Sequence, residues 1–168
     1  MALRPLEQRD TNGMLEWMLD AEINQFFQFN PKHINEDSVR EFIQNSYDDT
    51  KNRHYAIVDS YDQYLGTISL KNINQKDKNA EYAIALRKKS IGTGVAAIAT
   101  KEILNIAFHA LGLHKVYLNV LADNIRANKF YEKMGFIPEG EFRDHLFIRD
   151  RYRNLKWYSL TAEDVQNQ

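Results

Sequence analysis

Two glycines stand at the point where an apolar strand pattern gives way to a long apolar helix pattern. They belong to the stretch Lys89-Ser-Ile-Gly-Thr-Gly-Val95. Because glycine has no side chain, the backbone N–H groups of such a loop stay open, and the positive end of the following helix dipole favours a bound anion. The stretch therefore predicts a strand–loop–helix unit whose loop binds a phosphate or pyrophosphate.

Two familiar phosphate-binding motifs do not fit this loop. The dinucleotide fingerprint needs a third glycine where Ala97 stands, and a Walker A loop needs Gly-Lys-Ser/Thr after its glycines. A bare Gly-x-Gly is more often a simple helix start than an anion site. The preceding strand, residues 79–86, places Ala83 and Ala85 on one face, which leaves room for a slender ligand beside the strand.

The order of the predicted elements is typical of an α/β chain with a central mixed, mostly antiparallel sheet. Only one strong strand–helix–strand crossover is present, whereas a doubly wound dinucleotide fold needs several. The patterns predict about seven strands, over residues 2–6, 54–59, 64–71, 79–86, 115–121, 139–148 and 153–160. They predict about four helices, over residues 11–19, 35–46, 93–111 and 125–134.

Composition limits the classes of function. A chain of 168 residues without a linker-like stretch is expected to form one domain, residues 1–168. The net charge of −1 gives no reason to expect a nucleic-acid or membrane partner. We expect a cytoplasmic protein, because no run approaches the roughly 18 apolar residues of a membrane span and the first residues lack a signal-peptide core. There is no cysteine, and the five histidines do not fall at metal-ligand spacing, so no metal site is expected.

A second motif is Asn124-Ile-Arg-Ala-Asn-Lys-Phe-Tyr-Glu-Lys-Met-Gly-Phe136. Helical spacing puts Asn128 on the solvent side and Tyr131 at the edge of the core-facing stripe, where its phenol can reach a cleft. The stripe itself consists of Ala127, Phe130 and Met134. Taken alone, the segment is more simply an amphipathic core helix with a tyrosine at its boundary.

Together the two motifs resemble the GNAT superfamily of N-acetyltransferases, in which a Gly-rich pyrophosphate loop is followed by Asn-x-x-Ala-x-x-x-Tyr-Glu-x-x-Gly-Phe. The resemblance covers residues 79–160 and implies a GNAT-like fold. Three further segments resemble the branch that holds ribosomal-protein, spermidine and amino-sugar-nucleotide acetyltransferases. They are Gly66-Thr-Ile-Ser-Leu70, Leu113-His-Lys-Val-Tyr117 and Glu139-Gly-Glu-Phe-Arg143.

The resemblance implies that acetyl-CoA is the co-substrate and that no metal takes part. The pyrophosphate would bind the backbone amides of Ile91, Gly92, Thr93, Gly94 and Val95, with Lys89 where the family has Arg or Gln. The pantetheine arm would pair with the backbone of Ala83, Ile84, Ala85 and Leu86. Asn124 would hold a pantetheine amide, unless it serves only as a helix cap. Arg126 and Asn128 would reach the outer phosphates.

The same resemblance assigns the catalytic groups. Tyr131 matches the tyrosine beside the thioester sulfur, where a proton donor serves the departing thiolate, and a phenol stays protonated at neutral pH. Some relatives place a glutamate base where Asn119 stands; Glu81 is the best substitute, although an ordinary solvent-facing carboxylate fits equally. A strand amide near Ile84 would stabilise the oxyanion. Without cysteine no acetyl-cysteine intermediate can form, so direct attack of the amine on the thioester is the simpler route.

The acceptor is less constrained by the sequence. Aromatic residues gather in the first third of the chain and are suited to stack a sugar or base, although such residues are more often core: Trp17, Phe26, Phe27, Phe29 and His33. We favour a small primary amine, an amino-sugar nucleotide ahead of a polyamine, and a homodimer is possible. The alternatives are a ribosomal-type protein N-terminal acetyltransferase and a non-catalytic acyl-CoA-binding module.

Overall fold

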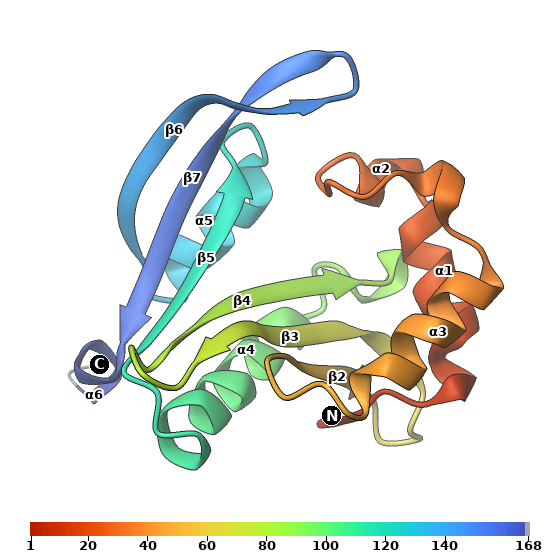
Figure 1. Cartoon of the computed structure of the whole chain (residues 1–168), viewed down its shortest axis with the longest axis horizontal. Helices are drawn as coiled ribbons and strands as arrows, with labels where there is room; N and C mark the ends of the chain where they lie inside the picture. The colour runs from red at the N-terminus through yellow and green to blue at the C-terminus, as the bar shows by residue number, and fades with distance from the viewer. Residues whose placement is uncertain (167–168) are drawn as a thin grey trace.

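The computed structural model describes residues 1–166 and contains one seven-stranded sheet with helices on both faces (Figure 1). The strand order is β1-β2-β3-β4-β5-β7-β6, and each neighbouring pair is antiparallel except β4–β5. The strands are β1 (Ala2–Pro5), β2 (Arg53–Val58), β3 (Tyr64–Asn74), β4 (Asn79–Leu86), β5 (Lys115–Leu121), β6 (Ile137–Ile148) and β7 (Arg151–Thr161). The mixed, mostly antiparallel sheet predicted from the sequence is confirmed.

The described residues form six α-helices, two more than expected. They are α1 (Thr11–Leu19), α2 (Ala21–Asn24), α3 (Glu36–Ser46), α4 (Val95–Asn105), α5 (Ile125–Lys133) and α6 (Ala162–Gln166). The two additional helices, α2 and α6, are only four and five residues long, too short to give a periodic pattern.

The helix predicted over residues 93–111 is wrong at both ends. Gly94 has φ +87°, a left-handed conformation that no α-helix can contain, so α4 begins only at Val95. At the other end α4 passes into a π turn, Ile106–Ala110, before Gly112 at φ +62° ends it.

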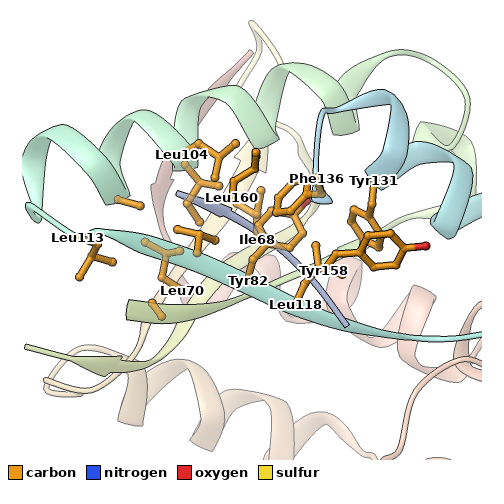
Figure 2. Packing of buried hydrophobic residues seen from close by; sticks show 14 of the residues in the cluster. Ile68, Leu70, Tyr82, Leu104, Leu113, Leu118, Tyr131, Phe136, Tyr158 and Leu160 are labelled. Atoms are coloured by element: carbon orange, nitrogen blue, oxygen red, sulfur yellow. The ribbon is translucent and has the colours of Figure 1, made fainter. Parts of the chain in front are cut away.

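Two hydrophobic clusters lie on opposite faces of the sheet. The larger one packs the strand residues Ile68, Leu70 and Leu118 against Ile103 and Leu104 of α4, and all five are at most 6% exposed (Figure 2). Burial of each such side chain contributes roughly 1.5–3 kcal/mol. The larger cluster fixes α4, and with it the Gly-rich loop, against the centre of the sheet.

The second cluster packs α1 and α3 on the other face. Met14 and Trp17 of α1 contact Val39 and Ile43 of α3, and all four are nearly fully buried. Asn35 caps α3 by accepting a hydrogen bond from the Ser38 N–H at 2.9 Å. Phe27 and Phe29, from the chain between α2 and α3, pack against this second cluster.

Strands β4 and β5 diverge soon after they meet, as Figure 1 shows. They pair only where Asn79–Glu81 lies beside Lys115–Tyr117. The N–H of Arg87 donates to the Leu65 carbonyl of β3. Backbone groups alternate along an antiparallel ladder, so the odd-numbered residues of β4 direct their N–H and C=O groups towards β3. The even-numbered residues direct theirs away from β3, towards β5. Beyond Glu81, β4 therefore presents an open backbone edge towards the gap.

Candidate active site

A cavity of about 1270 Å³ occupies the gap where β4 and β5 separate. Its walls come from β4, the loop before α4, the start of α5 and the segment after α2. Most residues singled out in the sequence line it: Glu81, Ala83, Ile84, Ala85, Leu86, Ile91, Gly92, Gly94, Asn124, Arg126 and Tyr131. A ligand that occupies this cavity meets the open edge of β4, where Ile84 directs its backbone groups.

The Gly-rich loop is held in a conformation that suits glycine. Gly92 and Gly94 have φ of +80° and +87°, and a Cβ at either position would meet no atom within 4 Å. The requirement is therefore conformational rather than steric. Within residues 1–166, the N–H groups from Gly92 to Ala96 have no hydrogen-bond acceptor, and they stand at the positive end of α4. The loop thus fits the pyrophosphate cradle that the sequence predicted.

Two parts of the expected loop contact differ in the structure. The N–H of Ile91 donates to the Lys88 carbonyl at 3.2 Å, so this amide is not free, and Ile91 lines the cavity with its side chain instead. Lys89 lies in the 3₁₀ turn Lys88–Ser90, is exposed and does not line the cavity. Thr93 and Val95 do not line it either; the Thr93 hydroxyl donates to the Ser90 carbonyl at 2.7 Å and braces the loop.

The two asparagines of the second motif have different surroundings. Asn124 caps α5, its Oδ1 accepting from the Ala127 N–H at 3.2 Å, and it also lines the cavity. Asn128 is 5% exposed and lies outside the cavity. Its Nδ2 donates to the carbonyls of Leu121 and Asn124, and its Oδ1 accepts from the Tyr158 hydroxyl at 2.9 Å.

The solvent-facing position predicted for Asn128 is therefore wrong, and the proposed cofactor contact is not supported. The physical reason is tertiary. The buried hydroxyl of Tyr158 on β7 needs a hydrogen-bond partner, and Asn128 supplies it from the face of α5 that packs on the sheet.

Tyr131 lines the cavity and stands in an aromatic cluster with Tyr82 and Tyr158 (Figure 2). Its ring lies 6.0 Å from the ring of Tyr82 and 6.2 Å from that of Tyr158. Within residues 1–166 its hydroxyl has no hydrogen-bond partner, although the residue lines the cavity. Burial raises the pKa of Tyr131 well above its usual value, so the phenol stays neutral and remains a proton donor at physiological pH.

Glu81 lies at the point where β4 and β5 separate. Its side chain is on the face of β4 opposite to that of its neighbour Tyr82, because side chains alternate along a strand. The Glu81 side chain is 16% exposed and forms an ion pair with the Nζ of Lys71 at 2.8 Å. The amide groups of Asn72 and Asn119 also donate to it, at 3.0 and 3.2 Å. Oε1 accepts from Lys71 and Asn119, whereas Oε2 accepts only from Asn72 and keeps a lone pair that could take a proton from an amine. Lys71 is a site residue that the sequence did not indicate.

The aromatic residues of the first third of the chain divide between core and cavity. Trp17 is core, and its Nε1 donates to the Tyr64 hydroxyl at 3.0 Å. Phe26, Phe27 and Phe29 line the cavity, and the last two pack on Trp17. His33 does not line the cavity. We call Phe26, Phe27 and Phe29 the aromatic wall.

Charge is distributed unevenly around the cavity. Glu81 is the only carboxylate among the described residues that line it. The cations that line it are Lys71, Lys101, Arg126 and Lys133. In residues 1–166, no group of three His, Cys, Asp or Glu side chains is arranged to hold a metal ion, and no helix has the length and apolar character needed to cross a membrane.

This geometry agrees with comparisons to known proteins. The model of the GNAT acetyltransferase domain matches residues 1–137. The chain belongs to the GNAT acetyltransferases. It is therefore an N-acetyltransferase that uses acetyl-CoA, and the fold and family predicted from the sequence are confirmed.

Its relatives include enzymes for different acceptors. The chain is 28% identical over 156 residues to the spermidine N(1)-acetyltransferase of Vibrio cholerae, covering 93% of this chain and 90% of that protein. It is 27% identical to a putative ribosomal N-acetyltransferase of Bacillus subtilis, covering 100% and 94%. The crystal structure of the Vibrio cholerae spermidine N-acetyltransferase in complex with CoA and spermine has a TM-score of 0.91 and 27% identity, covering 99% of this chain and 98% of that one.

Proposed function

We propose that residues 1–168 form a single domain that transfers the acetyl group of acetyl-CoA directly to the primary amine of a small molecule. The observation that carries this proposal is the open edge of β4 beyond Glu81, in a cavity that is also lined by the Gly-rich loop with its free amides and by the aromatic wall. A cytoplasmic location and a homodimer remain predictions from the sequence.

The residues around the gap have the chemistry to hold acetyl-CoA. The free N–H groups from Gly92 to Ala96 suit a pyrophosphate, and Arg126 and Lys101, which also line the cavity, add positive charge. The backbone groups of Ile84 suit an extended arm that lies along β4. When bound, acetyl-CoA supplies an activated acyl group.

Proton transfer is assigned to two groups on opposite sides of β4. Tyr131, kept neutral by burial, donates a proton to the leaving thiolate. Glu81 accepts a proton from the attacking amine, and Lys71 and Asn119 hold its carboxylate towards the gap. The N–H of Ile84, on the open edge, faces the place where the oxyanion develops. The chain has no cysteine to form an acetyl-enzyme, which supports direct attack.

We favour an amino-sugar nucleotide as the acceptor, for two reasons of cavity chemistry. The aromatic wall offers ring faces for a sugar or base. The cavity has a single carboxylate, already paired with Lys71, whereas a polyamine needs several carboxylates for its several positive charges.

A polyamine is the second candidate. It is supported by the relatives, since three of them are spermidine N(1)-acetyltransferases, one from Vibrio cholerae and two from strains of Escherichia coli. A protein N-terminus is a third, by likeness to the putative ribosomal enzyme.

The test is a panel of acceptors with a thiol reagent that detects released CoA. Because the chain contains no cysteine, the protein contributes no background. We expect acetyl-CoA and an amino-sugar nucleotide to release CoA at a higher kcat/KM than spermidine or a ribosomal N-terminal peptide. A higher value for spermidine would replace the favoured acceptor. Binding of acetyl-CoA without release by any amine would make the chain a non-catalytic acyl-CoA-binding module.

A further inference from the structure

Arg153 of β7 is a buried charge that does not line the cavity. Its side chain is 5% exposed. Nε donates to Oδ2 of Asp123 at 3.1 Å, and Nη2 donates to Oδ1 of the same carboxylate. Nη1 donates to the carbonyl of Gln25 at 2.8 Å, and the guanidinium lies 5.8 Å from the centre of the Phe26 ring. A buried arginine is stable only when it is paired in this way.

The segment that Arg153 contacts carries the aromatic wall. Residues 25–30 lie between α2 and a 3₁₀ turn and pair with no strand. Arg149, near the turn of the β6–β7 hairpin, donates to Oδ1 of the buried Asn24. Figure 1 shows the hairpin and α2 rising on the same side of β4. Arg149 and Arg153 of the hairpin thus bind Asn24 and Gln25, next to the aromatic wall, although they lie more than 120 residues further along the chain.

The other partner of Arg153 belongs to the acetyl-CoA side. Asp123 precedes Asn124, the N-cap of α5, which lines the cavity. Asp123 is half exposed and also accepts from Arg151 at 3.1 Å. A single guanidinium therefore joins the turn before α5 to the segment that carries Phe26.

We propose that Arg153 is a positioning residue that fixes the aromatic wall over the acceptor half of the cavity and so sets acceptor selectivity. The inference rests on the proposed function, because it takes this half of the cavity as the acceptor site. The geometry needs a planar fork for Asp123 and a third donor for Gln25, which a lysine cannot provide together. The face of the guanidinium also holds the Phe26 ring by a cation–π contact.

The experiment compares Arg153→Met and Arg153→Lys with a matched control, Arg151→Met. Arg151 binds the same carboxylate but is 65% exposed and makes no hydrogen bond or ion pair with residues 25–30. We expect Arg153→Met to raise the KM of the best acceptor about tenfold or more, with the acetyl-CoA Kd changed less than about twofold. Arg153→Lys should restore little of this loss, and Arg151→Met should behave as the wild type.

Amide hydrogen exchange across residues 20–34 supplies the second measurement. Exchange should be faster in Arg153→Met than in Arg151→Met, because residues 25–30 have lost the hydrogen bond to Gln25 and the cation–π contact with Phe26. Equal exchange in the two variants would overturn the inference, as would an unchanged acceptor KM or a parallel loss of acetyl-CoA binding. If the wild type acetylates no amine, the proposed function fails, whereas the exchange result still decides whether Arg153 holds the wall.

Discussion

Tyr131 combines deep burial with a hydroxyl that has no hydrogen-bond partner in residues 1–166. Because burial raises the pKa of Tyr131, its proton is present throughout the neutral range, which suits the proposed role of proton donor. We predict that Tyr131→Phe lowers kcat by about 10²-fold or more and leaves the acetyl-CoA Kd unchanged. Steady-state kinetics and calorimetric titration measure the two quantities.

A suitable control is Tyr158→Phe. Its ring lies 6.2 Å from that of Tyr131, but its hydroxyl donates to the buried Asn128 and also lies within hydrogen-bond distance of the exposed Glu132. This variant should lose stability and retain kcat, because a buried hydrogen bond is removed without touching the cavity. Equal kcat losses in the two variants would mean that Tyr131 acts through packing rather than as an acid.

Glu81 is the residue on which the base assignment depends. We predict that Glu81→Gln lowers kcat and flattens its increase with pH, because an amide cannot accept the proton of the amine. The pH dependence of kcat for the best acceptor is the measurement.

Glu139→Gln is the matched carboxylate control, since Glu139 is paired with Lys115 and lies outside the large cavity. The pH dependence of kcat in Glu139→Gln should have the same shape as in the wild type. An unaltered profile in Glu81→Gln as well would assign Glu81 to structure and leave proton removal to another group.

At the scale of elements, the unit formed by β4, the loop and α4 depends on left-handed glycines. We predict that Gly94→Ala destabilises the protein by about 1–2 kcal/mol, because an L-residue at φ +87° is strained even in open space. It should also raise the acetyl-CoA Kd, since the free amides turn as the strain relaxes. Chemical denaturation and calorimetric titration check the two effects.

Gly140→Ala provides the comparison. A Cβ at Gly140 likewise meets nothing within 4 Å, but Gly140 does not have a positive φ. Its stability and acetyl-CoA affinity should match the wild type. If Gly94→Ala matches it too, the cradle tolerates a side chain and the conformational explanation is incorrect.

The β4–α4–β5 unit is also where sequence patterns were most reliable. A strand, two glycines and a helix are set by residues close in the chain, and all three lie where they were predicted apart from the helix ends. The prediction for Asn128 was wrong. Helical spacing predicted a solvent-facing amide, but Asn128 is buried and accepts a hydrogen bond from the Tyr158 hydroxyl on β7.

At the scale of the whole molecule, His54 makes stability depend on pH. It is partly buried on β2, its Nδ1 lies 2.7 Å from the Ser69 hydroxyl, and burial lowers its pKa. The folded state therefore disfavours the charged form, and the unfolded state takes up the proton first, near pH 6.5. Stability from this group is present above that pH and is lost as the pH falls through it.

We predict that the wild type loses more unfolding free energy between pH 7 and pH 5 than His54→Gln, by urea denaturation at each pH. The carboxylates titrate in both proteins, so their contribution cancels when the two losses of unfolding free energy are subtracted. Equal losses of unfolding free energy in the two proteins would show that His54 does not cause the loss of stability at acid pH.

The sequence by itself determined the local features of this protein. These are the left-handed glycines, the Asn124 cap and the position of Tyr131 on α5. Each of them depends only on residues that are a few positions away in the sequence. The cavity, the Lys71–Glu81 pair and the hold of Arg153 on Gln25 were decided only by the tertiary structure. They require strands to diverge and a hairpin to reach a segment 128 residues away, which only packing of the whole chain specifies.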